Sequence, residues 1–176
     1  MTQIRFFIED LKRMLGKYKI RILHIWLSRS FWGIMIYRLE RSLYLLSPKI
    51  YGITRIPFIP LFNLIQMYSN LDIHYKANIK GGLLILHPSV GIVISGQAKI
   101  GKNLTLTGGN IIGAKRKSKK GEFEIGDNCS FGANATLIGP VIITNNISIG
   151  ASTCVVKSCL EEKSILAGVP AKRINN

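Results

Sequence analysis

Aliphatic residues recur at every sixth position from residue 72 onward. The repeat forms three runs: Ile73, Ile79 and Ile85; then Ile94, Ile100, Leu106 and Ile112; then Ile125, Phe131, Leu137, Ile143, Ile149 and Val155. A period of six is neither the 3.6 of a helix nor the 2 of a plain strand. Each hexapeptide can form one short strand and one turn, with its aliphatic side chain inside a narrow prism, and three hexapeptides complete a coil. The spacing therefore predicts a parallel β-solenoid over residues 72–176.

The corners of such a prism need residues that tolerate a positive φ. Asparagine and glycine do so at the lowest cost. Asn103, Asn128, Asn134 and Asn146 recur between the aliphatic positions, and we expect them at corners. With about 18 residues to a coil, the segment has room for about five or six coils.

The repeat slips twice, and insertions in a solenoid loop out from its surface. The first slip lies between Ile85 and Ile94 and contains His87. The second lies between Ile112 and Ile125 and contains the basic run 115–120. Both slips predict surface features beside a rigid scaffold, where binding and catalytic residues are often found.

His87 has the chemistry of a general base. Transfer of an acetyl group to a hydroxyl needs a base with a pKa near neutrality within hydrogen-bonding reach of that hydroxyl. A carboxylate that orients the imidazole assists it. Asp72 precedes His87 by fifteen residues, close to one coil, so the two can lie on adjacent rungs. A solvated turn histidine is the alternative interpretation.

Residues 1–71 form a different region, which carries much of the positive charge. The chain has a formal net charge of +15, and residues 1–50 hold ten Lys and Arg against Glu9, Asp10 and Glu40. The apolar spacing predicts two or three amphipathic helices that end before Pro48. The apolar stretch 56–68 has two prolines near its start and predicts an extended entry followed by a short helix.

This region has two interpretations. Its aromatic and basic residues could lie on an anionic membrane surface. Alternatively, its helices pack on their own core or on partner subunits, with solvated cations. The segment 20–39, the best candidate for a membrane span, is interrupted by Arg21, His24, Arg29 and Arg38. No signal peptide is evident, so the expected location is the cytoplasm, with peripheral contact at the inner face of the membrane.

Metal and nucleic-acid sites are not expected. The three cysteines include no CxxC pair, and the three histidines have no metal-ligand spacing. The run 115–120 carries five positive charges but has no aromatic platform for bases. It can instead be a solvated loop tip, or it can close over an acceptor or coenzyme with Lys115 and Arg116 as contacts.

Four motifs resemble the serine O-acetyltransferase branch of the hexapeptide-repeat acyltransferases. They are Asp72-Ile-His74, Leu86-His87-Pro-Ser-Val-Gly91, Leu106-Thr-Gly108-Gly109 and Ala167-Gly-Val-Pro-Ala171-Lys172. The resemblance implies a mainly β fold, a left-handed parallel β-helix with a short N-terminal α-helical region. It also implies a homotrimer, acetyl-CoA as co-substrate, and a catalytic dyad of His87 and Asp72. His74 matches a further motif position, either as a substrate contact or as a residue that shapes the first turn.

The resemblance also assigns positions to the coenzyme. Gly109, Ala133 and Ala151 match positions where small side chains let the pantetheine approach the backbone, although small-residue packing explains them equally well. Lys157 and Lys172 match cations near the nucleotide phosphates.

Three departures from the family pattern argue against L-serine as acceptor. Leu86 replaces an aspartate, and the stretch 120–124 lacks the arginine and histidine that hold the amino-acid carboxylate. The helical region is also about half the usual length. Together they favour the capsule and exopolysaccharide (colanic-acid-type) O-acetyltransferases, which modify a saccharide hydroxyl. Serine O-acetylation for cysteine biosynthesis and a non-catalytic scaffold are the alternatives.

Overall fold

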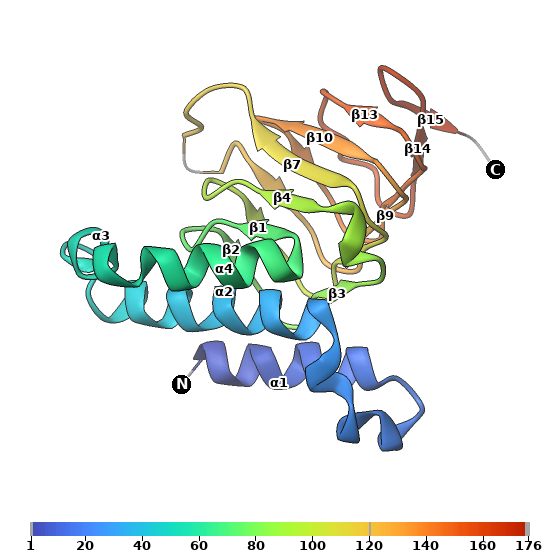
Figure 1. Ribbon diagram of the computed structural model, residues 1–176. Coiled ribbons are helices and arrows are strands. Elements are labelled where there is room, and N and C mark those ends of the chain that lie inside the picture. The colour runs from blue at the N-terminus through green and yellow to red at the C-terminus, as the bar shows by residue number, and fades with distance from the viewer. Residues whose placement is uncertain (1, 120, 175–176) are drawn as a thin grey trace.

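The computed structural model describes residues 2–119 and 121–174 and places a layer of helices under a three-sided β-helix (Figure 1). The helices are α1 (Thr2–Leu15), α2 (Arg29–Leu46), α3 (Tyr51–Thr54) and α4 (Ile59–Ser69), with 3-10 turns η1 (Lys19–Leu23), η2 (Ile25–Leu27) and η3 (Ile56–Phe58). The predicted end before Pro48 is confirmed. The extended entry at residue 56 is wrong, because Pro57 and Pro60 lie in the first turns of η3 and α4, where a missing N–H costs nothing.

Three sheets form the sides of the prism, and consecutive strands move from one sheet to the next. Sheet A contains β1 (Leu71–Ile73), β4 (Ile92–Ile94), β7 (Asn110–Ala114), β10 (Thr136–Gly139) and β13 (Cys154–Val155). Sheet B contains β2 (Asn78–Ile79), β5 (Lys99–Ile100), β8 (Glu124–Ile125) and β11 (Ile142–Ile143). Sheet C contains β3 (Leu84–Ile85), β6 (Thr105–Leu106), β9 (Ser130–Phe131), β12 (Ser148–Ile149), β14 (Ile165–Ala167) and β15 (Lys172–Ile174). All pairs are parallel except β14 with β15, which closes the last coil.

The six-residue repeat fills the core of the prism, as predicted. Every aliphatic or aromatic residue of the three runs is buried, with at most 4% exposure. The predicted asparagine corners are also confirmed: Asn103, Asn128, Asn134 and Asn146 have φ between 58° and 60°. The slips produce a 3-10 turn, η4 (Pro88–Val90), and the loop between β7 and β8.

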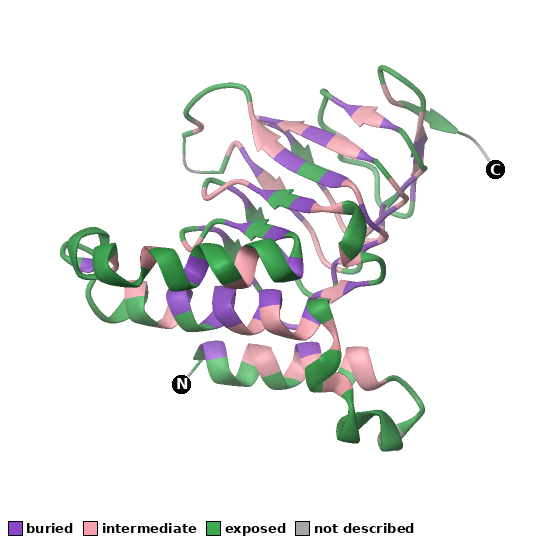
Figure 2. Ribbon diagram, in the orientation of Figure 1, coloured by how far each residue is buried: buried purple, intermediate pink, exposed green. Residues whose placement is uncertain are grey.

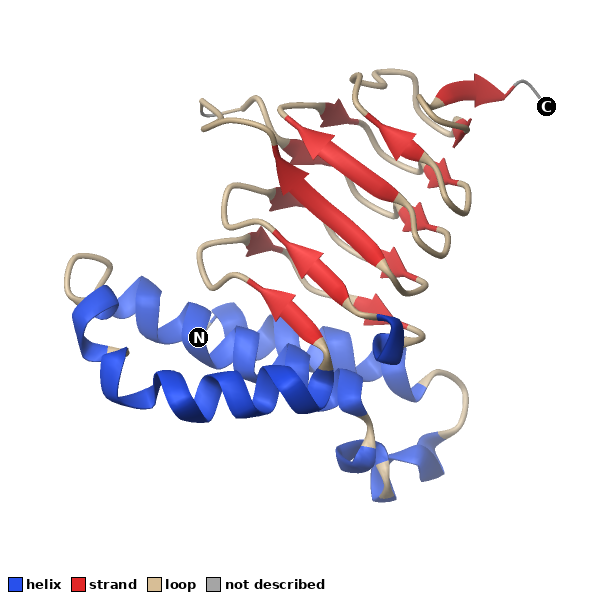
Figure 3. Cartoon of the chain, turned by 45° about the horizontal axis from the view of Figure 1, so that its top comes forward, coloured by secondary structure: helices blue, strands red, loops and turns tan. Residues whose placement is uncertain are grey.

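The helical layer covers the open end of the β-helix (Figure 3). A first coil has unpaired backbone groups at its edge, which are costly to bury without partners. Here side chains from the helices satisfy several of them. Asp10 accepts the Leu83 N–H at 2.7 Å, the Tyr37 hydroxyl donates to the Ala77 carbonyl at 2.9 Å, and Arg38 donates to two carbonyls of the same coil. The helices thus pack on the β-helix instead of forming a separate core.

The segment 17–29 projects from this layer and is largely exposed (Figure 2). Several of its exposed residues are apolar. Ile20, Leu23 and Trp26 are 70%, 71% and 54% exposed. Among the described helices, none combines the length and hydropathy that a membrane span requires.

Candidate active site

Corners of successive coils stack into two edges that border sheet A. The C–A edge joins strands of sheet C to the next strand of sheet A, and comprises residues 86–91, 107–109, 132–135 and 150–153. The turn 168–171, between β14 and β15 of sheet C, hydrogen-bonds to Cys154 and forms the last corner of this edge. The A–B edge lies at the other end of the sheet A strands, and comprises residues 74–77, 95–98, 115–119, 121–123, 140–141 and 156–158. Each predicted site residue except Asp72 and Lys172, which lie on strands, belongs to one of these edges.

His87 lies in the first corner of the C–A edge, immediately before η4. Its N–H donates to the Thr107 carbonyl at 2.8 Å, which fixes the backbone of the corner. The next coil passes very close, because a Cβ atom at Gly108 would lie 2.6 Å from the His87 carbonyl oxygen. Gly108 also has a φ of 148°. Only glycine suits this position, and the imidazole, on an exposed residue, remains accessible.

Asp72 points outward from β1, into a hollow of about 390 Å³ beside the same corner. Val90, Gly91 and Gly109 also line the hollow. The Asn70 side chain donates to the Ser89 carbonyl at 2.9 Å and so ties the start of β1 to the His87 corner. Among the described residues, no hydrogen bond joins Asp72 to His87. Asp72 thus lines a hollow bordered by Val90 and Gly91 of the corner that holds His87, and the catalytic dyad stays a prediction.

Gly109, Ala133 and Ala151 stack along the C–A edge beyond His87. The N–H of Gly109 donates to Gly91, that of Asn134 to Gly108, and that of Ser152 to Ala133, each at 2.8 Å. Lys172 pairs with Ala167 where β14 enters the last corner of this edge. Four of the five predicted coenzyme contacts therefore lie at or beside one strip that begins at His87.

Sequence reasoning overlooked the residues that hold this edge in shape. Asn110 is buried in the prism, where its side chain accepts the Gly108 N–H at 3.0 Å and donates to the Gly132 carbonyl at 2.7 Å. Asn70 ends α4 in the left-handed conformation, with φ 59°. The sequence did contain a sign of Asn110. It is polar, whereas the neighbouring repeats have an apolar or small residue at the same position.

His74, Lys115, Arg116 and Lys157 lie at the A–B edge. The His74 ring stacks on Tyr75 at 4.5 Å, and its Nδ1 accepts the Lys76 N–H at 3.1 Å. Burial lowers the pKa of His74, and Lys76 and Arg55 lower it further. These contacts are those of a residue that shapes the first turn. Sheet A separates this edge from His87, so these four residues could meet His87 only across a neighbouring copy.

No protein-family model matches the chain. It is 33% identical over 106 residues to the serine acetyltransferase of Staphylococcus xylosus, a match of 60% of this chain and 48% of that protein. The chain thus spans about half the length of the curated relatives it matches.

Solved structures cover almost the whole chain. Serine acetyltransferase of Neisseria gonorrhoeae aligns with 98% of this chain and 66% of its own, with 26% identity and a TM-score of 0.78, and a second structure of it is a complex with serine. The enzyme of Brucella abortus strain S19 in complex with coenzyme A aligns with 97% of this chain and 67% of its own, at 23% identity and a TM-score of 0.74. The expected left-handed parallel β-helix is confirmed.

The expectation of a saccharide acceptor in capsule or exopolysaccharide synthesis is wrong. The relatives and structural neighbours that match the chain carry the name serine acetyltransferase. The loop after β7 is not the only possible source of a cation for the serine carboxylate, because the helical layer places arginines beside the His87 corner. In sequence and in fold, the chain is similar to serine acetyltransferases built on a left-handed hexapeptide-repeat β-helix.

Proposed function

We propose that the chain transfers the acetyl group of acetyl-CoA to the hydroxyl of L-serine. The observation that carries the proposal is the C–A edge, where an accessible imidazole begins a strip of closely stacked, small-residue corners. The similarity to serine acetyltransferases over 106 residues supports the choice of acceptor.

The reaction needs one base and no covalent enzyme intermediate. His87 takes the proton of the serine hydroxyl, and the oxygen attacks the carbonyl carbon of the thioester. The tetrahedral intermediate collapses with cleavage of the C–S bond, and the imidazolium returns the proton to the departing sulfur. Asp72 orients the imidazole and stabilises its charged form. The products are O-acetylserine and CoA.

The C–A edge suits the coenzyme. Gly109, Ala133 and Ala151, none of them buried, leave room for an extended pantetheine arm to approach the backbone of successive coils. Lys172, exposed beside the last corner, offers a cation to the nucleotide phosphates. CoA supplies the activated acetyl group, while the residues of this chain supply position and the proton acceptor.

Thiol release from acetyl-CoA tests the proposal. With L-serine present, we expect free CoA to form at a rate that saturates with serine, together with O-acetylserine identified by mass. Acetyl-CoA hydrolysis without acceptor is the background control. Release that is the same with and without L-serine would refute the proposed function.

We further propose that the chain forms a homotrimer through the outer face of sheet A. This face carries Val93 and Ile111, 41% and 42% exposed, and these residues also line the Asp72 hollow. Sheet B presents the Lys99–Glu124 ion pair to solvent instead. A copy on sheet A would close the hollow and could bring A–B edge cations towards the site.

Ile111→Lys is expected to dissociate this trimer, because it places a charge in an apolar contact. Ile142→Lys on sheet B is the matched control, since Ile142 is 38% exposed and also points outward from a strand. Light scattering should give three times the 19.6 kDa chain mass for the wild type and the control, and a lower mass for Ile111→Lys. Equal masses for both variants would exclude sheet A as the contact.

The projecting segment 17–29 combines exposed apolar residues with Lys17, Arg21 and Arg29. This composition fits peripheral contact with an anionic membrane surface, and that contact stays a prediction.

A further inference from the structure

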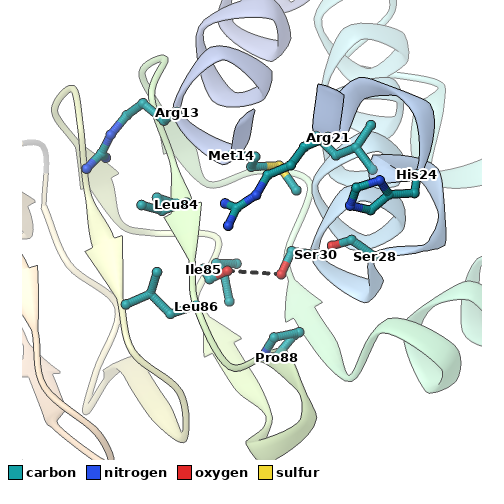
Figure 4. Close-up of a pocket in the computed structure, with 11 residues that line it drawn as sticks. Arg13, Met14, Arg21, His24, Ser28, Ser30, Leu84, Ile85, Leu86 and Pro88 are labelled. Carbon is teal, nitrogen blue, oxygen red and sulfur yellow. Dashed lines mark hydrogen bonds between the residues drawn. The ribbon is translucent and has the colours of Figure 1, made fainter. Parts of the chain in front are cut away.

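A second pocket adjoins the His87 corner on its sheet C side, between the β-helix and the helical layer. It has a volume of about 370 Å³. Arg13 of α1, Arg21 and His24 of the 3-10 segment, and Ser30 of α2 line one side, and Leu86 and Pro88 line the other (Figure 4). Since Leu86 and Pro88 flank His87 in the chain, the pocket adjoins the corner that holds the proposed general base.

The charged residues that line this pocket are all basic. Among the described residues that line it, two are arginines and none is acidic. Arg13 donates to the carbonyls of Gly82 and Leu104 and to the Thr105 hydroxyl, which are neutral partners. Arg21 forms no ion pair with any described residue, and its side chain points into the pocket in Figure 4.

Nearby acids do not neutralise the two arginines. Asp10 lies close enough to raise the pKa of Arg13, yet burial is the stronger effect and lowers that pKa. The Asp10 carboxylate is itself bound by Arg38 at 2.9 Å. The Arg21 guanidinium, which points into this partly enclosed space, favours an anion there, and guanidinium matches the two oxygens of a carboxylate.

On the basis of the proposed function, we infer that this pocket is the acceptor subsite and that Arg21 binds the carboxylate of the acceptor. Serine carries its carboxylate only a few bonds from its hydroxyl. A carboxylate held at Arg21 therefore leaves the hydroxyl near the Leu86–Pro88 corner, where His87 lies. Leu86 supplies an apolar wall, and the cation comes from the helical layer instead of the loop after β7.

Arg21→Gln tests the inference, because Arg21 is exposed and its replacement should leave the packing of the helical layer intact. Arg13 is less suitable, since it joins α1 to two coils. We expect the KM for L-serine to rise about tenfold or more, the effect of losing one charge-assisted hydrogen bond. The kcat and the KM for acetyl-CoA should change little. Arg21→Lys should restore part of the affinity.

2-Aminoethanol, which has the amine and hydroxyl of serine but no carboxylate, separates a specific contact from a general effect. The wild type should prefer L-serine strongly, and Arg21→Gln should reduce that preference by raising the KM for serine alone. Arg5→Gln is the control for net charge, since Arg5 is exposed on α1 and paired with Glu9.

The outcomes distinguish the two proposals. A wild type that turns over L-serine, with a KM unchanged in Arg21→Gln, would overturn the acceptor subsite and leave the function standing. An equal loss with L-serine and 2-aminoethanol would also overturn it, because the contact would then not involve the carboxylate. A wild type inactive with L-serine would overturn both.

Discussion

Replacing His87 with alanine is expected to lower kcat for acetyl transfer by about 100-fold to 10,000-fold, the usual contribution of general acid–base catalysis. The serine hydroxyl is a poor nucleophile until a base takes its proton. The imidazole lies on an exposed residue at a corner whose backbone is fixed by the bond to Thr107. Its removal therefore takes away the base and leaves the corner in place.

The measurement is initial-rate thiol release at saturating L-serine and acetyl-CoA, with thermal unfolding to show that the variant is folded. Asp72→Asn is the companion variant. It keeps the size of the side chain but removes the charge that stabilises the imidazolium, so we expect a smaller loss than for His87→Ala. A His87→Ala enzyme that retains wild-type kcat would show that another group takes the proton.

The β-helix could be predicted from the sequence because its contacts repeat. Each coil stacks on the one before it, and each of its three sides contributes one core residue that packs on its counterparts in the neighbouring coils. The same requirement for an apolar side chain therefore recurs at every sixth position. Ile79, Ile100 and Ile125 occupy successive strands of sheet B for this reason. The corners follow the same logic, since a left-handed turn selects asparagine or glycine from backbone geometry alone.

The roles of the basic residues could not be predicted in this way. Arg38 contacts Asp10, 28 residues away, and Arg13 contacts Thr105, 92 residues away. The two residues of such a pair are not separated by a repeating number of residues, so their contact produces no recognisable pattern in the sequence. The composition of the region therefore predicted arginines that face solvent or a membrane. In the structure, Arg38 and Arg13 instead hydrogen-bond to the coils of the β-helix that the helical layer covers.

The same limit explains the error about the acceptor. The stretch 120–124 lacks the arginine and histidine that hold the amino-acid carboxylate, and from the sequence alone that absence argued against L-serine. The fold brings residue 21 beside residue 86, so a cation from the N-terminal region can take the place of one in the loop. Gly108, in contrast, appears in a recognised motif, and its close approach to His87 explains why the motif contains glycine.

Replacing Arg38 with methionine is expected to destabilise the protein by about 3–5 kcal/mol, the cost of leaving a buried charge without its partner. The Arg38 and Asp10 side chains are 4% and 0% exposed and 2.9 Å apart. Arg38 also donates to the carbonyls of Ile79 and Lys80 in the first coil, at 2.6 Å and 2.9 Å. Its loss would leave these carbonyls and the Asp10 carboxylate without their cation, so denaturant unfolding should shift to lower concentration.

The loss should depend on pH. Burial already raises the pKa of Asp10, and Arg38 is the largest opposing influence. Without Arg38 the folded pKa rises further above the unfolded value of 3.8. The folded state then binds more protons than the unfolded state, and the stability of the variant falls as pH rises through this interval. Arg38→Met should therefore be less destabilised at pH 5 than at pH 8.

The double variant Asp10→Asn, Arg38→Met isolates the charge effect. Asparagine keeps an oxygen that can accept the Leu83 N–H, which Asp10 accepts at 2.7 Å, but it carries no charge that needs a partner. We expect the double variant to recover a large part of the stability lost in Arg38→Met and to lose its pH dependence. If the double variant were as unstable as Arg38→Met at every pH, the loss would come from the orphaned carbonyls of the first coil, and the ion pair would contribute little.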